Sequence, residues 1–115
     1  FKMECNFYFE VIAPKGLEVI KRQVELAELG LYVYVSDFND KGILKNRAGG
    51  QIEIGMDSSI SGLMQGSGYI DSDFQEAKDK MGILSNIFSS AGFPHKIGVD
   101  NEAGDSTFWY IYKYS

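Results

Sequence analysis

The stretch "SDFQEAKDKMGILSNIFSSAGFP", residues 72–94, has the signals of one amphipathic helix and of both its ends. Its apolar residues recur every three or four positions and form one stripe: Phe74, Ala77, Met81, Leu84, Phe88 and Ala91. Ser72 and Gln75 match a capping box at the start. Gly92 suits the left-handed conformation that ends a helix, and Pro94 prevents its continuation. We therefore predict a helix near residues 73–91 that packs its stripe on a sheet.

Residues 16–30, "GLEVIKRQVELAELG", predict a second helix of the same kind. Its apolar positions are spaced for one helix face and comprise Leu17, Ile20, Val24 and Ala27. Glu18 stands four residues before Arg22, a spacing that supports a helix on its solvent side. Gly30 is the expected stop, which places this helix near residues 16–29.

Residues 3–12, "MECNFYFEVI", alternate in the period of a strand with one buried face, formed by Met3, Cys5, Phe7, Phe9 and Val11. A later strand is expected to turn Ile52, Ile54 and Met56 inward. Other strand patterns cover residues 31–38, 95–100 and 107–114. We predict a turn at 39–42, a turn at 101–106, and a Gly/Ser-rich loop at 57–68 around a short strand near 67–70.

The order of these elements is strand, helix, several strands, helix, strand, strand. A chain of 115 residues fits one domain, so residues 1–115 are expected to fold together. Two strand–helix–strand units with a hairpin between them indicate an α+β fold. We predict a two-layer sandwich of the ferredoxin-like type, with one antiparallel sheet and two helices on one face.

Composition limits the class of protein and of partner. Apolar residues make up 44% of the chain and charged residues 23%, as in folded globular proteins. Eleven Lys and Arg against sixteen Asp and Glu give a net charge of −5, and the basic residues are scattered, so nucleic acid is a poor partner. Cys5 is the single cysteine, which suits a reducing compartment. Neither a membrane-length apolar run nor a signal-peptide core is visible, so we expect a cytoplasmic location and no membrane partner.

The residues with reactive side chains form no catalytic signature. His95, the only histidine, is expected at a strand edge on the face of Ile97 and Val99. Cys5 is expected to be a buried small hydrophobe with a raised pKa. The acidic run "DNEAGD", residues 100–105, is too short for a calcium loop and matches a solvated turn. We therefore expect no enzyme activity, no metal site and no cofactor.

Aromatic residues dominate the last strand. One set of alternating positions holds Phe108, Tyr110, Tyr112 and Tyr114, and the other holds Thr107, Trp109, Ile111 and Lys113. If Trp109 and Ile111 join the core, the first set lies on the face away from the helices, together with Tyr8, Tyr32, Tyr34 and Phe38. Such a tyrosine-rich face is typical of protein interfaces. Two alternatives remain open: the loop at 57–68 covers this face, or a second copy covers it in a homodimer.

The chain is small and acidic, has an α+β pattern, and has near its end "AGFPHKIGVDNEAG", residues 91–104, followed by an aromatic strand. In this the chain resembles small bacterial immunity proteins of contact-dependent inhibition and other polymorphic toxin systems. The resemblance implies a non-enzymatic inhibitor that binds a basic, nuclease-type toxin stoichiometrically in the cytoplasm. The acids that would steer the encounter and the tyrosines that would anchor it are Glu4, Tyr8, Glu10, Tyr32, Tyr34, Asp100, Glu102, Asp105, Tyr110 and Tyr112.

Three other functions stay open. The main alternative is a small-molecule-binding or regulatory α+β module, which could be dimeric and should contain an apolar cavity with convergent polar groups. An enzyme that uses His95 is a minor alternative. RNA binding is also minor, because the aromatic strands lack the neighbouring Lys or Arg of RNA-binding sheets.

Overall fold

The computed structural model describes residues 3–13, 16–35, 49–56 and 62–114, without the side chain of Met56. Two predicted features, the turn at 39–42 and the position of Phe38, lie outside these residues, as does the segment 57–61 of the predicted loop.

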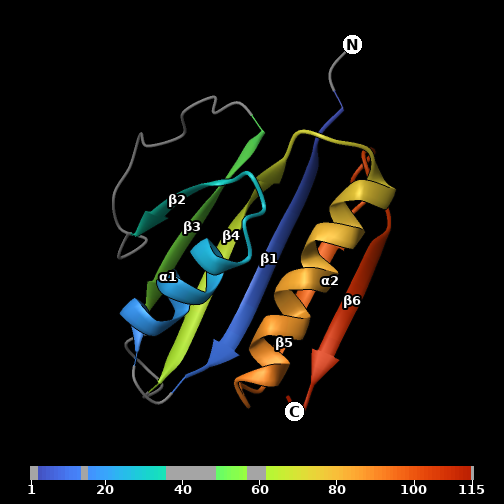
Figure 1. The fold of residues 1–115 in the computed structure, drawn as a ribbon. Coiled ribbons are helices and arrows are strands. Elements are labelled where there is room, and N and C mark those ends of the chain that lie inside the picture. The colour runs from blue at the N-terminus through green and yellow to red at the C-terminus, as the bar shows by residue number, and fades with distance from the viewer. Residues whose placement is uncertain (1–2, 14–15, 36–48, 57–61, 115) are drawn as a thin grey trace.

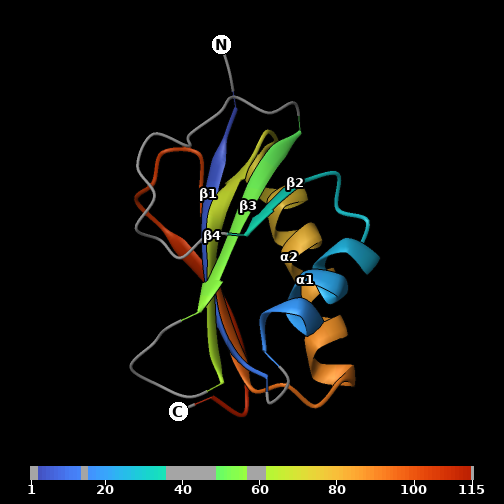
Figure 2. The same ribbon diagram turned by 90° about the vertical axis from the view of Figure 1, so that its left-hand side faces the viewer.

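The described chain forms six strands and two helices in one two-layer α+β arrangement. In chain order they are β1 (Cys5–Ile12), α1 (Leu17–Leu26), β2 (Tyr32–Val35), β3 (Gly50–Met56), β4 (Leu63–Ile70), α2 (Phe74–Ser90), β5 (His95–Asp100) and β6 (Thr107–Tyr112). The strands form one sheet in the order β2-β3-β4-β1-β5-β6 (Figure 1). Both helices lie on the same face of this sheet (Figure 2), as predicted.

The sheet itself differs from the prediction in two ways. It is mixed rather than antiparallel, because β2 pairs with β3 in parallel. The number and order of its strands also differ from those of a ferredoxin-like sandwich. The reason lies at β1, whose one edge is occupied over its whole length by β4, from Cys5 opposite Ile70 to Ile12 opposite Leu63. The strand that follows α1 therefore joins the sheet farther out, beside β3.

Strand β4 starts at Leu63, where the sequence predicted a loop that contained only a short strand near 67–70. Its core-facing row contains Gly66 and Gly68, which conceal the apolar alternation. A Cβ atom on Gly66 would lie 2.2 Å from the ring of Phe9, and one on Gly68 would lie 3.0 Å from the ring of Phe7. Glycine is needed at position 66 because the Phe9 ring fills the space above it, and at position 68 because a Cβ atom would also lie 1.9 Å from the Gln51 carbonyl oxygen.

Helix α2 ends as predicted but starts one residue later than expected. Its N-cap is Asp73 rather than Ser72, and the Asp73 carboxylate accepts a hydrogen bond of 2.8 Å from the Glu76 N–H. At the other end Gly92 has a φ of 79°, and the Phe93 N–H donates to the Phe88 carbonyl at 2.9 Å. This is the hydrogen bond of a Schellman ending.

Helix α1 is shorter than the predicted segment 16–29. It ends at Leu26 with Ala27 as its C-cap, and Gly30 with a φ of 75° follows after three residues. Between them Leu29 turns into the core, where it is buried. The backbone has left the helical conformation before Leu29, since Glu28 has a φ of 50°.

The core lies between the helices and the sheet. The rings of Phe9 on β1 and Phe88 on α2 meet there with a centroid distance of 5.6 Å. Gly82 of α2 lies close to Tyr110 of β6, since a Cβ atom on Gly82 would lie 3.0 Å from the Tyr110 hydroxyl oxygen. The fully buried apolar residues that the helices and strands contribute include Ile20, Ile52, Ile54, Ile70, Ala77, Met81, Leu84 and Ile97.

Candidate functional site

The sheet face turned away from the helices, here called the distal face, is not covered by any described helix (Figure 2). Cross-strand pairing carries one row of residues across it, from β2 to β6: Tyr34, Glu53, Ser67, Tyr8, Gly98 and Trp109. A second row contains Tyr32, Gln51, Tyr69 and Asn6. These residues alternate along each strand with residues of the core, because successive side chains of a strand point to opposite faces.

Trp109 is the largest side chain of the distal face. Its ring lies over Gly98, where an added Cβ atom would be 2.9 Å from the ring carbons. It meets Tyr8 edge to face, with ring centroids 5.4 Å apart and an interplanar angle of 88°. Both side chains remain 40% exposed. Gly98 thus provides the space in which an exposed aromatic pair is held in a fixed geometry.

A polar cluster borders this aromatic pair. The Glu10 carboxylate lies 3.3 Å from the Lys96 ammonium and accepts a hydrogen bond of 2.6 Å from the Tyr114 hydroxyl. The ammonium also lies 5.2 Å from the centroid of the Tyr114 ring and 5.9 Å from that of Trp109. Tyr114 reaches this face because Lys113, with a φ of 50°, bends the chain after β6. The prediction that Tyr114 shares a face with Tyr110 is therefore wrong.

Two neighbouring hollows lie on the distal face, and each has a volume of about 300 Å³. Both include Ser67 in their lining. The first is lined by Tyr8, Phe9, Glu10, Gln65, Gly66 and Ser67, and the second by Asn6, Phe7, Gln51, Glu53, Ser67, Gly68 and Tyr69. The amides, hydroxyls and carboxylates among these residues offer hydrogen-bonding groups beside the exposed aromatic rings.

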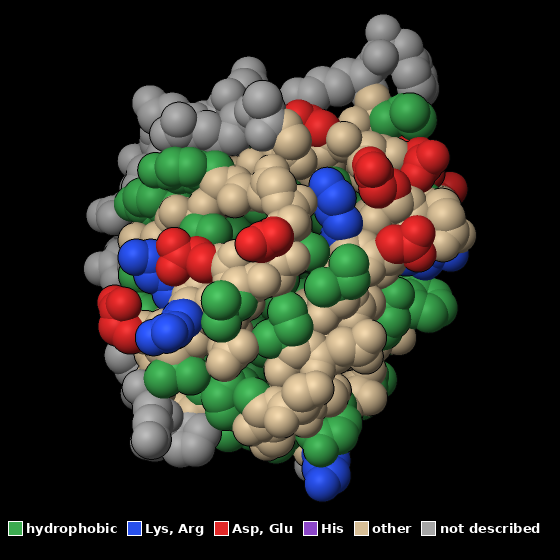
Figure 3. All heavy atoms as spheres, in the orientation of Figure 1, with side chains coloured by type: hydrophobic (Ala, Val, Ile, Leu, Met, Phe, Trp, Pro, Cys, Tyr) green, Lys and Arg blue, Asp and Glu red, His purple; other side chains and the backbone are tan. Residues whose placement is uncertain are grey.

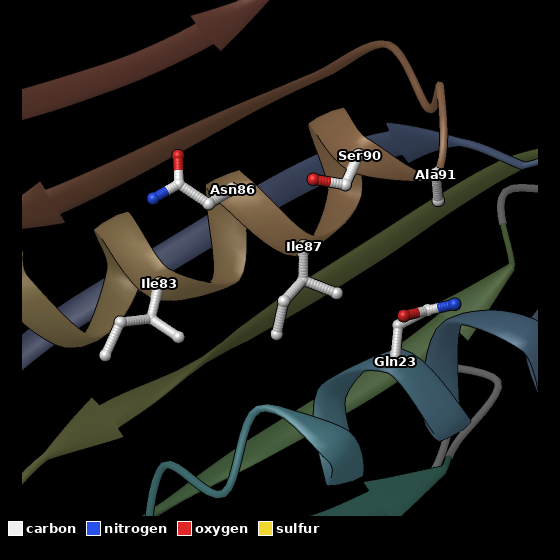
Figure 4. Close-up of a pocket in the computed structure, with 6 residues that line it drawn as sticks. All are labelled: Gln23, Ile83, Asn86, Ile87, Ser90 and Ala91. Atoms are coloured by element: carbon white, nitrogen blue, oxygen red, sulfur yellow. The ribbon is translucent and has the colours of Figure 1, made fainter.

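A further groove, of about 470 Å³, runs between α1 and α2 on the opposite side of the molecule (Figure 4). Its described lining consists of Gln23, Ile83, Asn86, Ile87, Ser90 and Ala91. None of these side chains titrates near neutral pH, so this described lining offers no general acid or base.

Two tyrosines that were predicted to bind a partner belong to the helix-bearing face instead. The Tyr110 hydroxyl donates a hydrogen bond of 2.7 Å to the carbonyl of Lys78 on α2, and burial, followed by the charge of Asp79, raises the pKa of Tyr110. Tyr112 stacks on the buried His95, with ring centroids 5.7 Å apart. The assumption that Trp109 and Ile111 enter the core was wrong, and it reversed both faces of β6.

The acids of the β5–β6 hairpin lie at one end of the sheet, where hydrogen bonds hold their side chains. Asp100 accepts a hydrogen bond of 2.7 Å from the Thr107 hydroxyl, and Asp105 exchanges two hydrogen bonds with Asn101. The Glu102 carboxylate accepts a hydrogen bond of 3.1 Å from the Phe74 N–H, the first residue of α2. Acidic side chains gather on the helix-bearing side over this end of α2 (Figure 3). Negative charge at this position stabilises α2, because the N-terminal end of a helix dipole is positive.

His95 is not a strand-edge residue, because its side chain is completely buried. Its Nδ1 lies 2.9 Å from the Phe93 carbonyl oxygen, which can only accept, so Nδ1 carries the proton. Its Nε2 therefore accepts from the Ser85 hydroxyl, 2.8 Å away. Burial lowers the pKa of His95, and the hydrogen bond to Phe93 opposes this shift. Ser85 is also buried, so this serine–histidine pair belongs to the core.

The thiol of Cys5 is buried as predicted and lies 3.6 Å from the carbonyl oxygen of Ser72. Burial, with a smaller contribution from Glu102 and other acids, raises the pKa of Cys5 to about 11. A thiol with this pKa is not a nucleophile at neutral pH. Among the described residues, no three His, Cys, Asp or Glu side chains are grouped so that they could hold a metal ion.

The distal face brings together Tyr8, Glu10, Tyr32 and Tyr34, which were predicted to bind a partner, and the predicted Asp100 lies at its edge. Glu4 lies just before β1 and is half-buried. This face also contains five residues that were not predicted to bind a partner: Glu53, Gln65, Ser67, Lys96 and Trp109. Glu53 could have been predicted, because it lies between the inward-facing Ile52 and Ile54. No local signal indicated the position of Trp109.

Comparison with protein-family models, with curated proteins and with solved structures found no match to this chain. Of the described helices, neither combines the length and the apolar character needed to cross a membrane.

Proposed function

We propose that this chain is a non-enzymatic inhibitor that binds a cognate basic toxin through its distal face, as an immunity protein of a toxin system does. The observation that carries the proposal is the row that contains Tyr34, Tyr8 and Trp109 together with the polar Glu53 and Ser67, on a face without a described helix over it. The complex would be stoichiometric and would form in the cytoplasm.

The aromatic residues of the row suit the role of anchors. Binding energy at protein interfaces concentrates in a few buried Trp, Tyr and Arg side chains, and each such residue costs about 2 kcal/mol or more when it is truncated to alanine. Tyr8 and Trp109 are held against each other before binding, so the partner would immobilise few additional rotamers.

The charges of the face favour a basic partner. The basic residue Lys96 lies on this face, but the Glu10 carboxylate is 3.3 Å from its ammonium group and balances its charge. Glu53 stands in the aromatic row between Tyr34 and Ser67. The whole chain carries a net charge of −5, which would accelerate the encounter with a cationic protein.

The shape of the face favours a protein over a small molecule. Each hollow of about 300 Å³ is at the lower end of the range of roughly 300–1,000 Å³ that ligand pockets span. Their lining comes from neighbouring strands of the sheet, and both hollows are open to solvent. An enclosed cavity, which would bury most of a small ligand, is not formed by these residues.

The test is to co-express the chain with the product of the adjacent upstream reading frame in a bacterial host. We expect the chain to protect the host from that product and to co-purify with it in a fixed ratio. Tyr8→Ala and Tyr34→Ala should accelerate dissociation, and Glu53→Lys should slow association and weaken its dependence on salt. Surface plasmon resonance at several salt concentrations measures both rates.

The matched control is Ile83→Ala, which removes an exposed apolar side chain from α2 on the opposite side of the molecule. Its binding rates should equal those of the parent chain. Loss of binding in Ile83→Ala together with unchanged binding of the tyrosine variants would refute the distal face as the binding surface. Absence of both protection and binding would refute the toxin as the partner.

A further inference from the structure

Strand β6 forms one end of the sheet and pairs with β5 alone among the described strands. Its six residues, "TFWYIY", contain neither a charge nor a proline. Phe108, Trp109 and Ile111 are 43%, 40% and 64% exposed. Natural sheets usually protect an end strand with lysine, proline, a bulge or a covering element, since its backbone groups can pair with another chain. The sequence of β6 contains neither lysine nor proline.

The outward backbone groups of β6 follow from its pairing with β5. The Asn101 N–H donates to the Ser106 carbonyl at 2.9 Å, and hydrogen-bonded pairs alternate along an antiparallel ladder. The N–H and C=O groups of Phe108, Tyr110 and Tyr112 therefore point toward β5. Those of Thr107, Trp109 and Ile111 point away from the sheet, where a further strand could bind them.

We infer that β6 pairs in antiparallel fashion with β6 of a second copy of this chain, about a two-fold axis at Trp109. Such an interface is self-complementary, as a two-fold dimer requires. In this register Thr107 lies opposite Ile111 of the second copy, and Trp109 lies opposite its own equivalent. Because residues 107–112 are uncharged, the net charge of −5 on each copy is not concentrated where the strands approach.

The charges that flank β6 select this register. With the axis at Trp109, Lys113, where the chain bends after β6, comes close to Asp105, in the turn before β6 of the second copy, and the symmetry produces this approach twice. Both side chains are exposed. A shift of the axis to Tyr110 would place Lys113 opposite Thr107 and would remove both charge pairs. Opposite charges directly across two strands stabilise their pairing, and like charges destabilise it.

One strand from each copy gives a small interface, so the dimer should be weak and dependent on concentration. Sedimentation velocity of the isolated chain over a wide concentration range should show a monomer–dimer equilibrium. Lys113→Asp alone and Asp105→Lys alone should each weaken dimerisation by roughly fivefold to tenfold, since each change creates two like-charge pairs. The double variant Lys113→Asp/Asp105→Lys should restore the parent equilibrium.

Two further variants complete the test. Arg22→Asp changes an exposed charge on α1, away from β6, and should leave the equilibrium unchanged. Ile111→Pro removes an N–H that points away from β5, so it should abolish the dimer while circular dichroism shows a folded monomer. A monomer at every concentration would overturn the inference, as would a dimer that ignores the single charge reversals. Because Asp105 and Lys113 lie outside the aromatic row, these outcomes are independent of toxin binding.

Discussion

On each face of the sheet an aromatic ring packs over a glycine, but the ring is buried on one face and exposed on the other. On the helix-bearing face the ring of Phe9 lies over Gly66 and against Phe88 of α2, and it is completely buried. On the distal face the ring of Trp109 lies over Gly98 and against Tyr8, and both rings remain 40% exposed. Phe9 and Tyr8 are neighbours on β1, so a single residue step separates a core ring from a surface ring.

This comparison separates stability from binding. A ring removed from the helix-bearing face leaves a cavity between tightly packed layers, whereas a ring removed from the distal face leaves a site that water can fill. The helix-bearing face should therefore determine the free energy of unfolding. The distal face should contribute less to this free energy and is available for contact with a partner.

The largest expected difference is between a carboxylate introduced into the core and one introduced on the distal face. Leu84→Asp, or equally Met81→Asp, would bury an unpaired charge beneath α2, which costs several kcal/mol, on the order of the whole stability of a small domain. We expect both proteins to be unfolded by circular dichroism. Tyr8→Asp is the matched control on the distal face and should unfold cooperatively. Cooperative unfolding of both helix variants would contradict the assignment of the core.

A smaller effect should distinguish two glycines on opposite faces. In Gly68→Ala the new Cβ atom would approach the backbone carbonyl oxygen of Gln51 to 1.9 Å, so β3 or β4 must move. In Gly98→Ala it would meet the ring of Trp109 at 2.9 Å, and that exposed side chain can turn away. Urea denaturation should show a loss of roughly 1–3 kcal/mol or more for Gly68→Ala and a smaller loss for Gly98→Ala.

Fluorescence provides a second readout for the same pair of variants. Trp109 is the only tryptophan, so Gly98→Ala should change the emission of the folded protein, while Gly68→Ala should change it less. Equal losses of stability in both variants, with unchanged emission, would show that Trp109 does not depend on Gly98 for its position.

The smallest effect concerns the pH dependence of stability on the helix-bearing face. Burial lowers the pKa of His95 in the folded state, so below its ordinary value of about 6.5 the unfolded chain binds a proton that the folded chain does not. The stability that depends on neutral His95 is thus complete above this pH and is lost as the pH falls below it. The slope should reach at most about 1.4 kcal/mol per pH unit.

Urea denaturation between pH 7.5 and pH 5.5, a range of about two units around the ordinary histidine pKa, measures this slope. His95→Gln is the matched variant, because it removes the only histidine and should abolish the slope. We also expect both His95→Gln and Cys5→Ala to leave partner binding within a few-fold, provided that they fold. A parallel decline of the parent and His95→Gln would assign the pH dependence to other groups.

Local patterns account for the parts of the fold that were predicted correctly. The stripes of α1 and of α2 without Ala91, the buried row of β1 from Cys5 to Val11 and the inward Ile52 and Ile54 of β3 follow from a periodicity within one segment. Met3 and Ala91, which were predicted to belong to these apolar faces, are exposed. The parts that were missed depend on distant residues. β4 was concealed because Gly66 and Gly68 take the place of apolar side chains beneath the rings of Phe7 and Phe9.

The candidate site divides in the same way. Tyr8, Tyr32 and Tyr34 could be selected in advance, because each alternates with apolar neighbours that clearly belong to the core. The faces of β6 could not, because both of its alternating sets contain large apolar residues. Glu102 was assigned to a partner, although its carboxylate binds the start of α2, which lies 28 residues away in sequence.

The sequence by itself therefore determined the α+β class, the two helices and the existence of two chemically different faces on β1, since these depend on periodicities of 3.6 and 2 within single segments. Only the tertiary structure decided the parallel pairing of β2 with β3, the burial of His95 and the face to which Trp109 belongs. Alternation divides a strand into two sets of side chains. Which set faces the helices is fixed by its pairing with a neighbouring strand, here by Trp109 opposite Gly98 and Tyr110 opposite Ile97.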